Sequence, residues 1–351
     1  MDIEWINNAV AEINNDWLQR AEAHQNVLTK PPGSLGRLET IAVRLSAMQA
    51  SSKPVIEKIQ ITVFASDHGI ANEGVSAFPQ AVTLEMVKNF ASGGAAISVL
   101  AKELGAELEV INLGTVADHD VIPGVMNQRI APGTNNFSQQ AAMSFNQLVE
   151  AFESGRETIA RMKNKSMQLF IGGDMGIANT TSATAIACAL LKLPAEMIVG
   201  PGTGLNAEGV KHKAKVINES LGLHASELND PVSILQSLGG FEIAALTAAY
   251  VACAQEGIPV LVDGFIASAA ALAAVEINPQ VKNWLFFSHS SAEPGHKKMM
   301  EYFDEVPLLD LGMRLGEGSG AAIAVSLLKH ACALHNGMAT FEQAGVSNKD
   351  G

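Results

Sequence analysis

The stretch IQITVFASDHG, residues 59–69, is a run of β-branched and apolar residues that ends in polar residues and a glycine. Such a run is typical of a strand covered on both faces, whose carboxyl end carries functional groups. Four further runs have the same character and are predicted as strands: LEVINLG (108–114), MQLFIGG (167–173), VLVDG (260–264) and WLFFSH (284–289). The strand at 59–69 is therefore expected to belong to a buried sheet.

Helical patterns separate these strands. They lie near residues 80–92, 94–104, 144–164, 179–191, 206–221, 240–256, 265–277 and 319–335. Strands that alternate with helices predict a mostly parallel sheet with helices on both faces, a Rossmann-like α/β fold. Ligands bind beyond the carboxyl ends of the strands in such sheets, so the loops DHG, GGDMGIANTT, DGF and SHSSAEPGH are expected to gather at one edge.

The two ends of the chain differ from this pattern. Apolar residues at helical spacing predict a helix over the first 28 residues, the KPPG turn ends it, and Ser34 is expected to cap a second helix. We expect residues 1–50 to contribute to a small helical domain that also includes terminal segments. Residues 51–335 are expected to form the large α/β domain, and residues 336–351 a C-terminal tail.

Composition limits the function. The 351 residues are 48% hydrophobic and 17% charged, which is enough apolar material for a large core, and the net charge of −13 disfavours nucleic acid as a partner. The three cysteines lack CxxC spacing, which argues against a disulfide framework or a zinc site. With no signal peptide pattern and no apolar run of about 18 residues, we expect a cytoplasmic protein without membrane contact.

The loop IGGDMGIANTTSATA, residues 171–185, joins a predicted strand to a predicted helix. Glycines let backbone N–H groups approach an anion, and a helix N-terminus favours negative charge. The loop is either a phosphate cradle or a plain capped turn. A second glycine loop, GPGTGL (200–205), precedes a helix with Lys211, Lys213 and Lys215, which are either phosphate ligands or a solvated basic face.

Three other clusters have ambiguous chemistry. His289, Glu293 and His296 in SHSSAEPGH, and the pair Asp67 and His68, do not match a metal-ligand spacing, so no metal is expected. Asp263 ends a predicted strand and either caps the following helix or binds a substrate hydroxyl. The stretch RLGEGSGAA (314–322) places Glu317 between two glycines before an apolar helix. Glu317 is either a general base with a raised pKa or a residue favoured by the helix dipole, which would lower the pKa.

Eight motifs in this order resemble the nicotinate-nucleotide–dimethylbenzimidazole phosphoribosyltransferase family. They are KPPGSLGRLE, ASDHGIANEGVSAFPQAVT, GGDMGIANTTSA, GPGTGL, LGGFEIAAL, VDGFIASAAALAA, SHSSAEPGH and LGEGSGAA. The resemblance covers about residues 28–340. It implies a parallel α/β domain, a small domain built from terminal segments, and a homodimer.

The resemblance also implies a reaction. The phosphoribosyl group of nicotinate mononucleotide passes to 5,6-dimethylbenzimidazole or a related base, which gives α-ribazole 5′-phosphate and nicotinate in the assembly of cobalamin. Nicotinate leaves without protonation, whereas the incoming azole must lose a nitrogen-bound proton. One base is therefore sufficient, and neither a metal nor another cofactor is implied.

The family motifs imply roles for individual residues of this chain. Glu317 is the expected general base. The phosphate and ribose are expected to contact Asp174, Gly176, Asn179, Thr180, Gly202, Gly204, Lys213 and Ser291. The aromatic base is expected to contact Phe78, Met86, Met175 and Leu315. Asp174 departs from the family, whose members often have the longer Glu there, and Phe78 and Met86 replace other side chains.

The chemistry of the residues alone also allows two other functions. The first is a metal-dependent hydrolase that uses Asp67, His68, His289 and His296. The second is a nucleotide-binding protein without catalysis.

Overall fold

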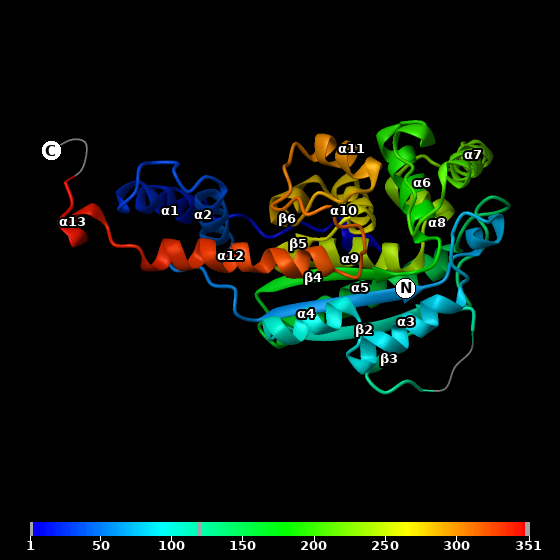
Figure 1. Cartoon of the computed structure of the whole chain (residues 1–351), viewed down its shortest axis with the longest axis horizontal. Helices are drawn as coiled ribbons and strands as arrows, with labels where there is room; N and C mark the ends of the chain where they lie inside the picture. Colours follow the sequence, from blue (N-terminus) through cyan, green and yellow to red (C-terminus); the bar gives the residue numbers. More distant parts are fainter. Residues whose placement is uncertain (1–2, 118–120, 348–351) are drawn as a thin grey trace.

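The computed structural model describes residues 3–117 and 121–347. Within these residues a six-stranded, all-parallel sheet forms the centre of the molecule, with the strand order β3-β2-β1-β4-β5-β6 (Figure 1). The strands are β1 (Ile59–Ser66), β2 (Glu107–Gly114), β3 (Val125–Asn127), β4 (Leu169–Met175), β5 (Val260–Val262) and β6 (Leu285–Phe287). The predicted parallel α/β fold is confirmed.

Helices cover both faces of the sheet. On one face α5 (Phe145–Asn164) packs against α9 (Phe241–Gln255), and α9 packs in turn on β1, β4 and α10 (Phe265–Ile277). On the other face lie α3 (Ala81–Ser92), α4 (Ala96–Leu104) and the first turns of α12 (Ser319–Gly337). Because helices cover both faces, every residue of β1 is buried, as its apolar run predicts.

The remaining helices surround one end of the sheet or belong to the terminal segments. They are α1 (Asn15–Val27), α2 (Arg37–Gln49), α6 (Asn179–Leu191), α7 (Ala207–Leu223), α8 (Pro231–Leu238), α11 (Pro294–Phe303) and α13 (Phe341–Ala344). Short 3-10 turns are η1 (Glu4–Asn7), η2 (Gly69–Glu73), η3 (Ala195–Met197) and η4 (Pro279–Trp284). None of the helices among the described residues has the length and apolar character needed to cross a membrane.

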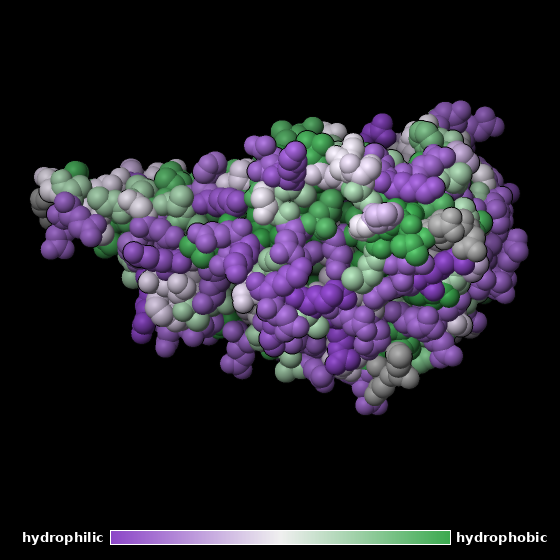
Figure 2. Space-filling model, turned by 90° about the horizontal axis from the view of Figure 1, so that it is seen from below, coloured by the Kyte–Doolittle hydropathy of each residue, from purple (hydrophilic) through white to green (hydrophobic). Residues whose placement is uncertain are grey.

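The terminal segments meet away from the sheet. Helix α2 packs on both α1 and α12, and an isolated antiparallel bridge joins Leu28 to Thr340 near α13 (Figure 1). These helices project from the side of the sheet and form the narrow end of the molecule in the space-filling view of Figure 2. The division into domains at residues 50 and 335 stays a prediction, and residues 348–351 of the expected tail lie outside the described residues.

Several local predictions are wrong. The first 28 residues are not one helix, because an extended segment separates η1 from α1. Ser34 does not cap α2, whose N-cap is Gly36 with φ +55°, a conformation that glycine adopts readily. The strand β3 and the helices α8 and α11 were not predicted. The strand has only three residues and no apolar run, and both helices begin with a proline, which marks a break when it is met in the sequence.

The parallel register aligns the carboxyl ends of the strands. Ala65 of β1 lies opposite Met175 of β4, and Val262 of β5 lies opposite Phe287 of β6. The order of the strands reverses between β1 and β4, where loops diverge to opposite sides of the sheet and leave a crevice. The fold therefore offers one binding site at this edge.

Candidate active site

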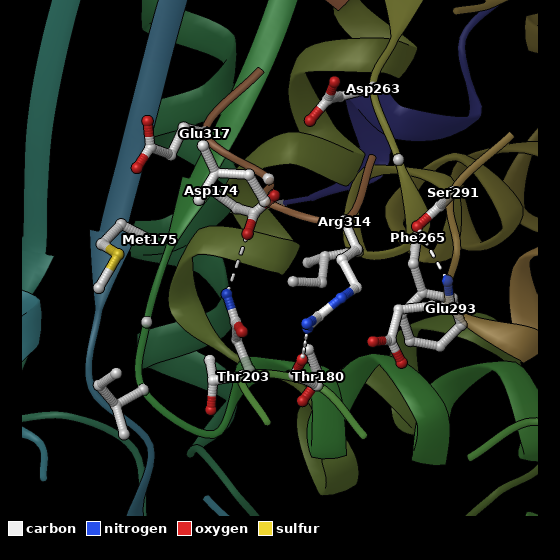
Figure 3. A pocket seen from close by; sticks show the side chains of 18 of the residues that line it. Asp174, Met175, Thr180, Thr203, Asp263, Phe265, Ser291, Glu293, Arg314 and Glu317 are labelled. Carbon is white, nitrogen blue, oxygen red and sulfur yellow. Dashed lines mark hydrogen bonds between the residues drawn. The ribbon is translucent and has the colours of Figure 1, made fainter. Parts of the chain in front are cut away.

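A cavity of about 520 Å³ lies at the carboxyl edge of the sheet (Figure 3). The predicted site residues that line it are Phe78, Met86, Asp174, Met175, Gly176, Asn179, Thr180, Gly202, Ser291, Leu315 and Glu317. They come from separate loops, which the chain brings together only at the ends of the strands. Gly204 and Lys213 do not line the cavity.

Lys213 lies directly behind the cavity wall. The lysine is 1% exposed, and its Nζ donates to the Thr180 Oγ1 at 2.7 Å. A Cβ at Gly202 would lie only 2.8 Å from that oxygen and 3.4 Å from the Lys213 Nζ, so the two glycine loops meet at this point. Desolvation lowers the pKa of Lys213 to about 8, although the nearby Glu293 opposes that change. Lys213 therefore does not line the cavity itself but holds the hydroxyl of Thr180, which does.

The stretch around Glu317 forms a tight turn that immediately precedes α12. Gly316, Glu317 and Gly318 have φ values of +88°, +64° and +87°, and the Ser319 N–H donates to the Gly316 carbonyl at 3.0 Å. Gly316 and Gly318 adopt positive φ readily, so the turn requires glycine at these two positions, whereas positive φ is uncommon for glutamate. A residue held in such a conformation is often part of a functional site.

Burial makes Glu317 a stronger base. The side chain is 5% exposed, and burial raises its pKa, an effect that the charge of Asp263 adds to. The opposing contribution is one long hydrogen bond, 3.4 Å, from the Ile97 N–H at the start of α4 to the Glu317 Oε2. Glu317 lies before the N-cap of α12 and caps nothing in that helix. The expected interaction of Glu317 with the start of α12 is therefore wrong, and its hydrogen bond goes to the first turn of α4 instead.

Asp174 lies beside Glu317 in the cavity (Figure 3). Burial raises the pKa of Asp174 well above its ordinary value, and the charges of Asp263, Glu242 and Glu317 raise it further. The Asn179 Nδ2 donates to the Asp174 Oδ2 at 3.0 Å and partly offsets this. Asp174 is therefore disposed to hold a proton, and the amide of Asn179 is already engaged by it.

Sequence reasoning missed Arg314 as a site residue. Arg314 lines the cavity, and its Nη1 donates to the Gly202 carbonyl at 2.9 Å (Figure 3). Arg314 directly precedes Leu315 in the RLGEG motif, and this position next to a predicted site residue could have indicated its role. Phe265 and Glu293 also line the cavity and were not chosen. Burial raises the pKa of the Glu293 carboxyl, while Lys213 and Arg314 lower it. Arg314 adds a second cation to the side where the glycine loops meet.

The histidines of the ambiguous clusters have protein partners. The His68 Nε2 lies 2.6 Å from the Glu242 Oε1, and the same carboxylate accepts from the Ser66 hydroxyl. The His296 Nε2 lies 3.2 Å from the Ser268 Oγ. Among residues 3–117 and 121–347, no group of three or more His, Cys, Asp or Glu side chains is arranged to hold a metal ion.

Asp263 caps a helix, but not the one expected from the sequence. The carboxylate accepts from the Gly318 N–H at 3.1 Å and from the Ala321 N–H at 2.8 Å, both at the start of α12. The following helix, α10, has Gly264 as its N-cap and no side-chain cap. The prediction that Asp263 caps its neighbouring helix is wrong, because the partner lies more than fifty residues away.

A parallel sheet whose glycine loops border one cavity, with Arg314 lining it and the buried Lys213 behind Thr180, is typical of an α/β enzyme for a phosphorylated substrate. Comparison with known proteins agrees with this class. A family model described as "Phosphoribosyltransferase" matches residues 10–346 of the chain. The chain is therefore an enzyme of the phosphoribosyltransferase class.

Individual relatives identify the family. The nicotinate-nucleotide–dimethylbenzimidazole phosphoribosyltransferase of Pseudomonas aeruginosa is 55% identical over 349 residues, which is 99% of each chain. The protein of that name from Xanthomonas euvesicatoria is 56% identical over 348 residues, 99% of this chain and 100% of that one. The crystal structure of the Thermus thermophilus enzyme of that name superposes with a TM-score of 0.90 at 39% identity and covers 95% of this chain and 99% of that chain. The chain belongs to the nicotinate-nucleotide–dimethylbenzimidazole phosphoribosyltransferase family, as the motif order predicts.

Proposed function

We propose that the protein transfers the phosphoribosyl group of nicotinate mononucleotide to 5,6-dimethylbenzimidazole or a related base. The observation that carries the proposal is that the buried Glu317 carboxylate lines the same cavity as the two glycine loops and Arg314. A base and an anion site a short distance apart are what this transfer requires. The products are α-ribazole 5′-phosphate, nicotinate and one proton.

Glu317 is the proposed general base. The bond between C1′ and the pyridinium nitrogen breaks, and its electron pair stays on the departing nicotinate. A nitrogen lone pair of the benzimidazole forms the new bond on the opposite face of C1′, which inverts β to α. The second nitrogen of the azole then gives its proton to Glu317. The raised pKa of Glu317 supports this role, because a general base works best when its pKa approaches the working pH.

The phosphate is proposed to bind where the two glycine loops meet. Gly176 and Gly202 line this part of the cavity, and the close approach of Gly202 to Thr180 leaves no room for a larger residue. Lys213 and Arg314 supply positive charge to a chain that is otherwise strongly acidic. Asn179, Thr180 and Ser291 line the same cavity and are also proposed to contact the phosphate. Asp174 is proposed to face the ribose, while Gly204 shapes the loop from outside.

The aromatic base is proposed to lie against an apolar wall. The residues of this wall are Phe78, Met86, Met175 and Leu315. Phe78 is 50% exposed and Leu315 is 59% exposed, so they stand at the mouth of the cavity. Apolar walls discriminate weakly between related bases, since one methylene is worth about 1–3 kcal/mol. We therefore expect several benzimidazoles to be accepted.

A panel of acceptor bases tests the proposal. The purified protein is mixed with nicotinate mononucleotide and one benzimidazole, purine or phenol at a time, and the products are read by mass. We expect nicotinate together with a phosphoribosylated base. Base-independent cleavage that a chelator abolishes would favour the metal-dependent hydrolase, and binding without any turnover would favour a nucleotide-binding protein.

The protein is also proposed to act as a homodimer, with residues 1–50 and the terminal segment after residue 335 contributing to a small helical domain. Two features support this. Helix α2 contacts α1 and α12 away from the sheet, and Phe78, Leu311 and Leu315 leave apolar side chains exposed. A second copy of the chain would bury such side chains.

A further inference from the structure

We propose that Asp263 is a positioning residue for Glu317, which it holds in its functional conformation by clamping the first turn of α12. This inference rests on the proposed role of Glu317 as the general base. Asp263 follows β5 directly, is 1% exposed and lines the cavity beside Glu317.

The contacts of Asp263 replace a cap that α12 lacks. The N-cap of α12 is Gly318, which has no side chain to accept a hydrogen bond from the first turn. One Asp263 oxygen accepts from the Gly318 N–H at 3.1 Å, and the other accepts from the Ala321 N–H at 2.8 Å. The two bonds fix the backbone that begins one residue after Glu317.

The clamp is needed because the turn is strained. Glu317 has φ +64°, and a non-glycine residue persists in this unfavourable region only where its surroundings hold it there. The other side of the turn rests on β4, where a Cβ at Gly173 would overlap the Glu317 carbonyl. The turn is thus held between β4 below and the Asp263 carboxylate at the end of β5.

His289, which also lines the cavity, is the second support of the clamp. The His289 Nε2 lies 3.6 Å from the Asp263 Oδ1, and the ring packs against the first turn of α12, where a Cβ at Gly320 would overlap it. The Asp263 carboxylate raises the pKa of His289, although burial opposes this. His289, a buried residue just after β6, therefore holds the Asp263 carboxylate in place, and this carboxylate in turn holds the first turn of α12.

Asp263→Asn tests the inference, because asparagine keeps the shape and one acceptor but loses the second accepted bond. We expect kcat to fall by about 10- to 100-fold, the range that a small displacement of a reacting group produces. The KM for nicotinate mononucleotide is expected to change by less than about threefold. A higher KM with an unchanged kcat would overturn the inference and assign Asp263 to substrate binding.

A double-mutant comparison separates positioning from general loss of structure. If Asp263 acts through Glu317, adding Asp263→Asn to Glu317→Gln should lower kcat by less than about threefold further. If it lowers kcat by the same factor as in the wild-type chain, Asp263 acts independently and the inference is wrong. A near-normal Glu317→Gln variant would instead contradict the proposed base, so the two failures are distinguishable.

Asp67→Asn is the matched control. Asp67 is also 1% exposed at the carboxyl end of a strand and accepts a backbone hydrogen bond, from the Val116 N–H at 2.8 Å, but it does not line the cavity. We expect its kcat per folded molecule, with the folded fraction measured by circular dichroism, to stay near the wild-type value. A loss equal to that of Asp263→Asn would show that any buried strand-end carboxylate has this effect and would overturn the inference.

Discussion

Glu317 combines a strained backbone with a buried carboxylate that does not bind its own helix. Both properties cost stability, since the left-handed conformation is unfavourable for glutamate and burial disfavours the charged carboxylate. Residues that break local rules in this way are expected at functional sites. The positive φ and the burial of Glu317 therefore support its proposed role as the base.

Glu317→Gln should lower kcat by about 10²-fold or more, because the amide cannot accept the azole proton. In the wild-type chain kcat should also fall as the pH drops through the raised pKa of Glu317, since only the ionised carboxylate is a base. Steady-state rates across the acidic and neutral pH range measure both effects. Glu301→Gln, on the exposed surface of α11, is the control and should match the wild type. Near-normal turnover of Glu317→Gln would remove the assignment.

Lys213 should give the opposite limb of the pH profile. Its pKa is lowered to about 8, so kcat/KM for nicotinate mononucleotide should fall as the pH rises through about 8 and the ammonium loses its charge. Lys213→Ala should raise the KM and abolish this limb.

The control for Lys213 is Lys215→Ala on the same helix, since Lys215 is exposed and pairs with Glu219. We expect its KM to equal that of the wild type. Unchanged KM and kcat in Lys213→Ala would exclude this residue from the phosphate site.

At the scale of elements, α12 links the site to the terminal helices. Its 19 residues extend about 28 Å, from the turn at Glu317 to the contact with α2. The first turns are buried against the sheet and His289, whereas at Gly337, in the last turn, an added Cβ would meet open space. Small residues in the first turns are therefore a packing requirement and not a general property of this helix.

Two glycines of α12 should respond oppositely to alanine. At Gly320 the new Cβ would overlap the buried His289 ring, and overpacking of this kind costs about 1–3 kcal/mol of the free energy of unfolding. At Gly337 nothing lies within 4 Å, so alanine should be neutral or stabilise by up to about 1 kcal/mol. Thermal and denaturant unfolding measure the difference. Equal stabilities of Gly320→Ala and Gly337→Ala would contradict the packing seen at the start of α12.

The sequence predicted elements with a clear apolar pattern well and irregular ones poorly. The strand at 59–66 and the helix at 179–191 show in the chain as long runs of one period. The three-residue β3 has no such run, and the extended segment between η1 and α1 carries apolar residues that imitate a helical period. Pattern, not length, decided which elements were recognised, because the three-residue strands β5 and β6 were predicted from the apolar runs VLV and LFF.

At the scale of the whole molecule, exposed apolar residues support the proposed homodimer. Leu311 and Leu315 are each 59% exposed, and Leu315 lines the cavity together with the half-exposed Phe78. We expect sedimentation equilibrium at micromolar concentration to give twice the mass of one chain. Leu311→Lys should shift the protein toward the monomer, whereas Val99→Lys, at a similarly exposed site on α4, should not. A monomeric wild-type protein would contradict the proposed homodimer.

The sequence by itself determined the parallel α/β fold, the family and half of the residues that line the cavity. Both the periodicity of each segment and the order of the motifs depend only on the order of residues along the chain, so they can be predicted without knowing any contact. Only the tertiary structure decided that Lys213 lies behind Thr180, that Arg314 enters the cavity, and that Asp263 caps α12. Each of these depends on contacts between segments far apart in the chain. The pKa of Glu317 depends on the same contacts, because burial, and not its neighbours in sequence, sets the free energy of its charge.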